Sequence, residues 1–290
     1  MVKHEPVLLK EVMEMLSIKE NGTYLDATAG GGGHSSAILS RISDQGHLVC
    51  TDRDETAIEE LNRKFRNSRI KIRQARFSDL IDTINEMGID AVDGVLFDLG
   101  VSMFQLKILE RGFSFESDER LDMRMDRMQL LTAWDVVNTY TEKDIANIVY
   151  EYSDERRSRR IARAIVHNRK KKTIDTCKEL ADIIARAYGR RGRIHPATRT
   201  FQALRIAVND ELNELRQGLK NAFQLLHSGG RVCVISYHSK EDRIVKHFFR
   251  EMARNKTCNL ITKKPVAVSR DEIRTNPAAR SAKLRGAEKV

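Results

Sequence analysis

The residues best suited to chemistry in this 290-residue chain surround a run of four glycines, in DATAGGGGHSSAIL at 26–39. The apolar run TYLDA precedes the glycines and a helical pattern follows them. Glycine lets the backbone adopt positive φ and lets a ligand approach closely, and a helix N-terminus supplies free N–H donors. This order is therefore typical of a nucleotide-binding loop, with a flexible hinge as the structural alternative.

The spacing around the glycines separates two kinds of nucleotide site. Gly30 and Gly32 form G-x-G, but Ser35 stands where the dinucleotide pattern G-x-G-x-x-G needs its third glycine. Asp26 instead gives Asp-x-x-x-Gly-x-Gly, which resembles the first motif of Rossmann-type S-adenosylmethionine (AdoMet) methyltransferases. An acid there suits the ammonium of an amino acid end and repels a pyrophosphate. The pattern predicts AdoMet as cofactor, with Asp26, Gly30 and Gly32 as contacts.

Three further candidates follow later apolar runs. Asp52 ends HLVCTD, about twenty residues beyond the glycines, where a carboxylate can accept from both ribose hydroxyls of AdoMet or NAD. Phe77 follows RIKIRQA, and either packs on adenine or belongs to the core. Asp98 lies in GVLFDLG, at the carboxyl edge where open α/β sheets bind ligands. An acid in this place is costly to bury unpaired, which favours a functional role.

Positioning these residues requires a parallel sheet. Apolar runs alternate with helical patterns such as DETAIEELNRKF, for which Asp54 is the expected N-cap. This alternation predicts βαβ units. The four expected strands cover 23–27, 47–52, 69–75 and 94–100.

The α/β pattern breaks between about 105 and 203, where helical patterns replace it. It returns with one long helix in ALRIAVNDELNELRQGLKNAFQLLHSGG and a strand in RVCVISYHS. We therefore predict an α/β, Rossmann-type methyltransferase fold with an inserted helical domain. Residues 1–105 and 204–290 would bind AdoMet, and 106–203 would form the basic, substrate-recognising insertion. The polar stretch 254–290 is expected to be only partly ordered.

The chain is basic, with a formal charge of +10 and a pI near 9.5. Residues 151–172 hold nine Lys or Arg against three acids, and 186–205 hold six Arg and no acid. One such run is as often a solvated helix face, but two in one insertion favour a nucleic-acid surface. The predicted RNA-binding residues are Arg156, Arg157, Arg159, Arg160, Lys170, Lys171, Lys172 and Arg199.

Other classes of site are not indicated. The four cysteines form no C-x-x-C pair, which argues against a disulfide framework or a zinc site and favours a reducing cytoplasm. The histidines show no ligand spacing such as H-E-x-x-H, so no metal is predicted. No apolar stretch approaches the length of a membrane span, and we expect a soluble, cytoplasmic protein without membrane contact.

Taken together, the motifs closely resemble the RsmH (MraW) family of bacterial methyltransferases. The matching stretches are HEPVLLKEV, GGGGHS, TDRD, DLGVS, RGFSF, LDMRMD, RRIARAIV, HPATRTFQALRIAVNDEL, HSKEDRIVKHF and RSAKLR. The resemblance implies an AdoMet-binding Rossmann domain with a helical insertion. It also implies methylation of N4 of a cytosine in the decoding region of small-subunit (16S) ribosomal RNA.

The resemblance also implies roles for individual residues. The family's glycine-glycine-histidine loop matches Gly32, Gly33 and His34 as cofactor contacts, although His34 taken alone could equally be a capping or packing residue. Asp52 becomes the ribose acid. Phe77 becomes the adenine-side residue, and Asp98 and Gln105 the cofactor residues after the fourth strand. The family pattern is not met everywhere. The departures are Met103 for serine, Asp118-Glu119-Arg120 for Asp-Gly-Pro, Tyr237 for phenylalanine, Lys240 for leucine and Ala278 for arginine.

Two residues are candidates for catalysis. The exocyclic amine of cytosine is a poor nucleophile, and an acceptor held against its N–H would make it more reactive. Asp98 is that acceptor or, alternatively, a binder of the methionine or adenosine part of AdoMet. His238, after RVCVISY, contacts the base or its proton, or else serves only in structural hydrogen bonding. A stacked or paired target base would have to be splayed out.

Several alternatives stay open at this point. A nicotinamide-dependent oxidoreductase would share the fold and Asp52, and a non-catalytic RNA-binding factor would share the basic insertion. The departures leave room for a diverged paralogue with another target nucleotide. The assembly stage of the ribosomal substrate, the oligomeric state (a homodimer is one arrangement) and the identity of any general base are not set by the sequence.

Overall fold

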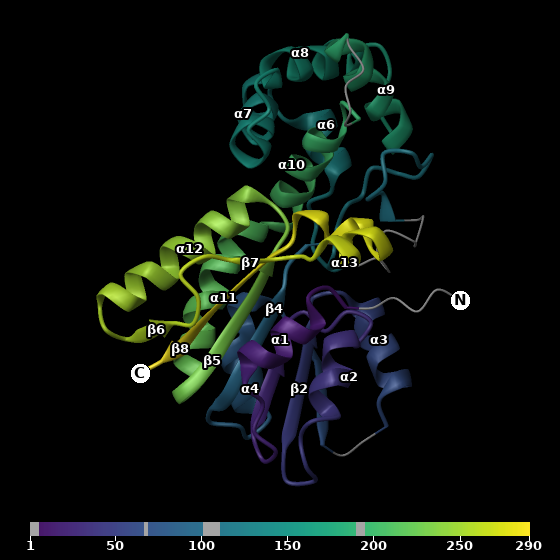
Figure 1. The fold of residues 1–290 in the computed structure, drawn as a ribbon. Coiled ribbons are helices and arrows are strands. Elements are labelled where there is room, and N and C mark those ends of the chain that lie inside the picture. The colour runs from purple at the N-terminus through teal and green to yellow at the C-terminus, as the bar shows by residue number, and fades with distance from the viewer. Residues whose placement is uncertain (1–5, 67–68, 101–110, 190–194) are drawn as a thin grey trace. The chain divides into compact units, whose positions relative to one another are not determined.

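The computed structural model describes residues 6–66, 69–100, 111–189 and 195–290. The chain divides into two compact units, one of residues 1–100 and 212–290 and one of residues 101–211. Figure 1 shows the first as a sheet covered by helices and the second as a group of helices.

The first unit is built on an eight-stranded sheet in which β3, β2, β1, β4, β5, β8 and β6 lie side by side in that order, and β7 pairs with β8. The first five strands are parallel, and β8 runs antiparallel to β5, β6 and β7. The strands are β1 (Thr23–Asp26), β2 (His47–Asp52), β3 (Ile70–Gln74), β4 (Val92–Asp98), β5 (Leu226–Ser236), β6 (Cys258–Leu260), β7 (Val266–Ala267) and β8 (Lys283–Lys289). The chain order reverses between β1 and β4, where open α/β sheets bind their ligands.

Helices cover both faces of this sheet (Figure 1). They are α1 (Leu9–Leu16), α2 (Gly33–Leu39), α3 (Glu55–Lys64), α4 (Leu80–Glu86), α11 (Glu211–Leu225), α12 (Ser239–Arg254) and α13 (Arg270–Thr275), with short 3-10 turns at Phe77–Asp79 and Pro277–Ser281. One core cluster joins the sheet to α4, α11 and α12, and another joins it to α1, α2 and α3. The α/β fold class predicted from the sequence is confirmed.

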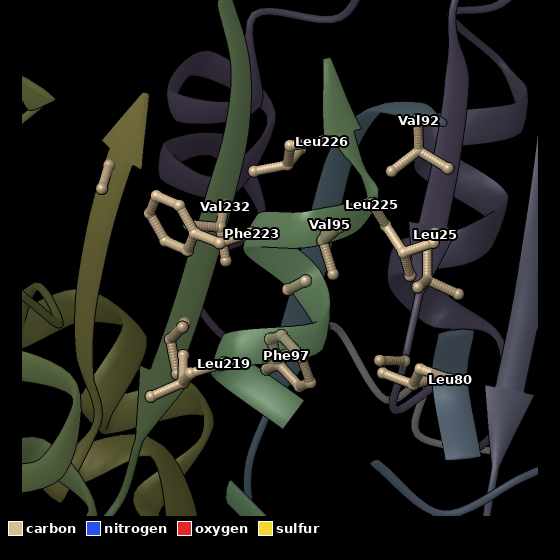
Figure 2. Packing of buried hydrophobic residues seen from close by; sticks show 14 of the residues in the cluster. Leu25, Leu80, Val92, Val95, Phe97, Leu219, Phe223, Leu225, Leu226 and Val232 are labelled. Atoms are coloured by element: carbon tan, nitrogen blue, oxygen red, sulfur yellow. The ribbon is translucent and has the colours of Figure 1, made fainter. Parts of the chain in front are cut away.

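The central strands are mostly apolar because they are buried on both faces. Successive side chains of a strand point to opposite faces, so Val95 and Phe97 of β4 enter one cluster while Leu96 enters the other. Figure 2 shows Leu219 and Phe223 of α11 lying among the side chains of these strands. Because the central strands are packed on both faces, the residues at their carboxyl ends are held in fixed positions.

The expectation of a partly ordered stretch at 254–290 is wrong. Strand β8 lies inside the sheet, between β5 and β6, and buries Leu284 and Ala287. Its polar side chains are paired: Arg285 lies 2.7 Å from Asp242, and Glu288 lies 2.8 Å from Arg231. The strand was missed because its charged residues are satisfied by long-range partners that composition does not reveal.

The second unit consists of helices around its own core. They are α6 (Ala133–Thr139), α7 (Glu142–Ser153), α8 (Ser158–Arg169), α9 (Cys177–Tyr188) and α10 (Thr198–Asn209). Capping boxes begin two of them, with Thr132 and Asp135 at α6 and Thr176 and Glu179 at α9.

The single long helix expected at 203–230 is also wrong. Two helices, α10 and α11, replace it, because Asp210 adopts left-handed backbone angles (φ 47°) and interrupts the helical hydrogen bonds. Aspartate is one of the few residues that tolerate this conformation. Among the helices of the described residues, none is long and apolar enough to cross a membrane.

Candidate active site at the carboxyl edge of the sheet

The glycine loop joins the end of β1 to the start of α2. Gly30 and Gly32 have positive φ (48° and 69°), which glycine adopts without strain. A Cβ on Gly32 would lie 2.7 Å from the Phe65 ring, and one on Gly33 would lie 2.5 Å from Pro6. A Cβ on Gly31 would meet no described atom within 4 Å. The fold itself therefore requires glycine at 32 and 33, and the loop is open at 31.

Asp26 is buried beneath this loop and forms hydrogen bonds with residues on both sides of the glycines. Its carboxylate is 1% exposed and accepts from the Ser35 hydroxyl at 2.6 Å and from the backbone N–H of Thr28 at 3.3 Å. Burial raises the pKa of Asp26, and the nearby His34 acts in the opposite direction. The contacts seen for Asp26 thus hold α2 against β1, and its predicted contact with the ammonium of AdoMet stays a prediction.

Asp52 links the end of β2 to the same loop. One oxygen accepts from the backbone N–H of Gly30 and the other from that of Asp54, both at 2.9 Å. Burial raises the pKa of Asp52 to about 6, while these two N–H groups favour the ionised form. At neutral pH the carboxylate is therefore ionised and can accept further hydrogen bonds. The expected N-cap, Asp54, accepts from the N–H of Thr56 at 3.0 Å and is confirmed.

Asp98 lies at the end of β4, across the reversal of strand order from Asp26. Its backbone N–H donates to the Thr28 hydroxyl at 2.6 Å, and the Tyr237 hydroxyl donates to its Oδ1 at 2.8 Å. Burial, followed by the Asp98 carboxylate, raises the pKa of Tyr237, so the phenol remains a donor at any assay pH. Asp98 is thus held at both its backbone and its side chain.

His34 is buried between Asp98 and the segment ahead of α1. Its Nε2 lies 3.0 Å from the carbonyl oxygen of Val7, and its Nδ1 lies 3.7 Å from Oδ2 of Asp98. Because a carbonyl only accepts, Nε2 carries hydrogen, and Nδ1 pairs with Asp98 only when the ring is doubly protonated. The structure therefore brings His34 beside Asp98, where sequence reasoning had placed both near the cofactor.

The other predicted site residues have mainly structural neighbours. Phe77 packs edge-to-face on Phe97, with ring centroids 5.0 Å apart, which is the core alternative left open above. His238 is the N-cap of α12: its Nδ1 accepts from the N–H of Glu241 at 3.3 Å, and its Nε2 lies 3.1 Å from the Glu241 carboxylate. These contacts match the structural role considered for His238. Gln105 lies outside the described residues.

Sequence reasoning missed three residues that shape this edge. Tyr237 was noted only as a departure from the family pattern, although its hydroxyl contacts Asp98. Glu241 is 3% exposed and accepts from the backbone N–H of Tyr237 at 2.8 Å, fixing the turn into α12. Lys64, at the end of α3, donates to the carbonyls of Gly31 and Gly32 at 2.7 and 2.8 Å. The capping pattern H-S-K-E could have revealed Glu241, whereas the contacts of Tyr237 and Lys64 are long-range.

In the second unit, all eight predicted RNA-binding side chains belong to exposed residues. Three of them have partners there. Arg157 lies over the Tyr188 ring at 4.2 Å, Lys172 pairs with Glu179 at 2.7 Å, and Arg199 lies 3.6 Å from Glu155.

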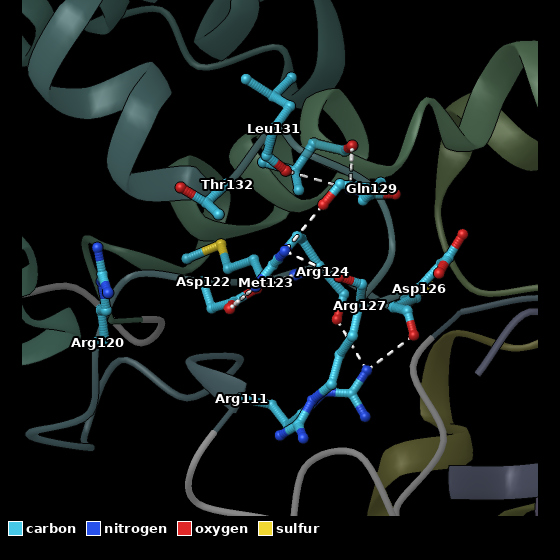
Figure 3. A network of polar contacts seen from close by, with 12 residues as sticks. Arg111, Arg120, Asp122, Met123, Arg124, Asp126, Arg127, Gln129, Leu131 and Thr132 are labelled. Atoms are coloured by element: carbon cyan, nitrogen blue, oxygen red, sulfur yellow. Dashed lines mark hydrogen bonds and ion pairs between the residues drawn. The ribbon is translucent and has the colours of Figure 1, made fainter. Parts of the chain in front are cut away.

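The LDMRMD stretch of the same unit forms a network of polar contacts (Figure 3). Arg124 donates to both oxygens of Asp122 at 2.8 Å, and Arg111 donates to the carbonyls of Arg124 and Met125 at 2.8 Å. Burial opposes ionisation of Asp122, but the hydrogen bonds from Arg124 outweigh it and lower the pKa of Asp122. The network fixes the shape of a loop that has no regular secondary structure.

The fold and the site define a class: a Rossmann-type α/β protein whose glycine loop and acids suit a nucleoside with a cationic end. The Asp52 carboxylate can accept further hydrogen bonds, as the ribose hydroxyls of a nucleoside require, and carboxylates at this edge disfavour a pyrophosphate. The family model described as the MraW methylase family matches residues 1–290, and the chain belongs to this family. It is a methyltransferase whose cofactor is S-adenosylmethionine, as predicted.

Individual relatives align with this chain over their whole length. The chain is 49% identical over 295 residues to "Ribosomal RNA small subunit methyltransferase H" of Persephonella marina, and 48% identical over 307 residues to the protein of that name from Caldicellulosiruptor saccharolyticus. Each alignment covers 100% of both chains. A solved rRNA methylase from Streptococcus thermophilus matches 100% of this chain and 99% of its own, with 10% identity and a TM-score of 0.47.

Proposed function

We propose that this protein transfers a methyl group from AdoMet to the exocyclic N4 of a cytosine in the decoding region of small-subunit (16S) ribosomal RNA. The family membership and the names of the full-length relatives support the reaction and the substrate. The observation that carries the mechanism is the anchored carboxylate of Asp98 at the reversal between β1 and β4. The proposed partner is the small ribosomal subunit, in the cytoplasm.

The residues of the site have different proposed roles. Bound AdoMet supplies an electrophilic methyl group on a sulfonium. Asp52 is placed to accept from ribose hydroxyls, and the open face at Gly31 leaves room for backbone contact. Asp98 is placed either to accept from the N4–H of cytosine or to hold the cofactor, and holding reactants in line is a large part of catalysis. The neutral thioether S-adenosylhomocysteine would be the leaving group, and the proton that N4 loses would pass to the Asp98 carboxylate or, where Asp98 holds the cofactor instead, to solvent.

The helical unit is proposed to hold the RNA. Its exposed arginines and lysines on α8 and in the turn after it can neutralise phosphates while the target base is splayed out. The predicted boundaries of this domain, 106–203, are kept as a proposal for the RNA-binding part. Affinity for RNA should then fall steeply as salt rises.

The experiment compares Asp98→Asn and His238→Ala with wild type. Methyl transfer to unmodified 16S ribosomal RNA and AdoMet binding are measured separately, and modified bases are mapped. We expect Asp98→Asn to lose most activity, and His238→Ala to lose activity only if it contacts the base. Asp93→Asn is the matched control, because Asp93 lies on the same strand but bonds Lys19 and the Thr23 N–H. Full activity in Asp98→Asn would remove that residue from the mechanism.

A further inference from the structure

The exposed face of α12 carries a row of arginines. Arg243, Arg250 and Arg254 recur at intervals of seven and four residues, which places them on one face of the helix, with His247 between them. All four residues are exposed, and the row extends about 16 Å at 1.5 Å per residue. Within the part of the chain that the structure describes, these three arginines form no ion pair.

The acids of this helix do not neutralise the row. Glu241 is buried in the cap, and Asp242 pairs with Arg285 at 2.7 Å and with Lys283 at 3.5 Å. Glu251 is exposed and lies three residues before Arg254, so it is a neighbour of one end of the row, but among the described residues it forms no ion pair with that arginine. A solvated helix usually mixes charges, as α3 does, where Arg63 pairs with Glu59 at 3.1 Å. The exposed positive charge of this row is therefore only partly offset by the acids of α12, which favours an anionic partner.

The row begins beside the active edge. Strand β5 pairs with β4 so that Ile235 lies opposite Asp98, and Tyr237, the next residue but one, contacts the Asp98 carboxylate. Helix α12 begins two residues later, at Ser239, and Arg243 lies about one turn along it. A strand whose target base reaches Asp98 would thus have its flanking backbone close to the start of the row.

We propose that Arg243, Arg250 and Arg254 form a second RNA-binding surface, on the methyltransferase unit itself, that binds the backbone of the strand flanking the target base. This surface rests on the proposed function, since it requires an RNA substrate, but it is separate from the basic residues of the helical unit. Arginine suits the role because its planar guanidinium binds phosphate through two N–H groups and stacks on bases.

The test is the triple variant R243Q/R250Q/R254Q. Its control is K10Q/R63Q/R73Q, which removes the same charge from exposed residues of α1, α3 and β3 in the same unit. Binding to unmodified 16S ribosomal RNA is measured at several salt concentrations, together with AdoMet affinity and methyl transfer. Each lost phosphate contact lowers the slope of log affinity against log salt by about 0.7 on a single strand. We therefore expect the slope to fall by about 2 in the test variant, with RNA affinity reduced about tenfold or more at low salt.

The two variants must differ for the proposal to hold. The slope and KM for RNA should change in the α12 variant far more than in the control, while the affinity for AdoMet stays the same in both. Equal RNA slopes in the two triple variants would overturn the proposal and make the row a solvated face or a site for an acidic protein. A wild-type protein that leaves no methyl group on the RNA would instead contradict the proposed function, so the two failures are distinguishable.

Discussion

Replacing Tyr237 with phenylalanine removes one hydroxyl group from the site and little else. The ring can stay where it is, because it packs against Gly100, where an added Cβ would lie 3.3 Å from it. The change deletes the 2.8 Å hydrogen bond to Oδ1 of Asp98. Hydrogen bonds to charged groups contribute about 1.5–3 kcal/mol, and one pH unit corresponds to about 1.4 kcal/mol. Since Asp98 keeps 24% of its side chain exposed, water replaces part of the bond, and we expect an effect of about one pH unit.

The direction of the pH shift follows from the hydrogen bond that the Tyr237 hydroxyl donates to Asp98. The phenol stabilises the ionised carboxylate, so its loss makes Asp98 easier to protonate and moves the acid limb of the kcat/KM profile to higher pH. His34, 3.7 Å from Oδ2, and Asp26 also act on this carboxylate and are unchanged by the substitution. The assay is methyl transfer from pH 5 to 9 with saturating RNA, and AdoMet affinity measured at each pH. Activity at high pH should be largely retained. An acid limb that does not move, in a protein that binds AdoMet normally, would refute the reasoning.

Three further outcomes are expected. Burial raises the pKa of Asp52 to about 6, so the carboxylate protonates as the pH falls through that value. AdoMet affinity, measured by calorimetry, should therefore weaken below pH 6, and the Asp52→Asn variant should bind AdoMet weakly with little dependence on pH. Lys64→Met should raise the Kd for AdoMet about two- to fivefold, because two hydrogen bonds from an exposed lysine to the glycine loop are lost, and leave kcat at saturating AdoMet unchanged. Asn209→Ala should lower the free energy of unfolding in urea by about 2–3 kcal/mol, because the buried Met125 N–H loses its acceptor; a loss below about 0.5 kcal/mol would contradict this account.

The parts of the fold that the sequence predicted are those with local causes. Buried parallel strands are largely apolar runs, and that signal predicted β1, β2 and β4. Strand β3 is more exposed and carries charged residues, and it was predicted from its place in the alternation of strands and helices. The turn through Gly30 and Gly32 needs positive φ, and the cap at Asp54 needs a side-chain acceptor, so both leave a mark in the sequence itself. Position at the carboxyl ends of strands was enough to bring Asp52 and Asp98 to one edge.

The parts that the sequence did not predict depend on partners far along the chain. Strand β8 looks polar because Arg285 and Glu288 are read without Asp242 and Arg231. Tyr237 is 139 residues from Asp98, so no spacing rule connects its hydroxyl with that carboxylate. The break at Asp210 was hidden because the apolar periodicity continues across it from α10 to α11.

The glycine loop shows why a motif and a site are different things. Two of its four glycines are explained by the protein alone, since side chains at 32 and 33 would collide with Phe65 and Pro6. The loop's carbonyls are bound by Lys64, and its first positive-φ residue donates to Asp52. A sequence that kept the glycines but lost these distant partners would still match the pattern, yet its loop would have to be ordered by the ligand. That ordering would cost about 1–2 kcal/mol for each residue fixed, and the binding free energy would fall accordingly. If AdoMet binds at this loop as proposed, its affinity depends on the contacts that order the loop and not on the glycine run alone.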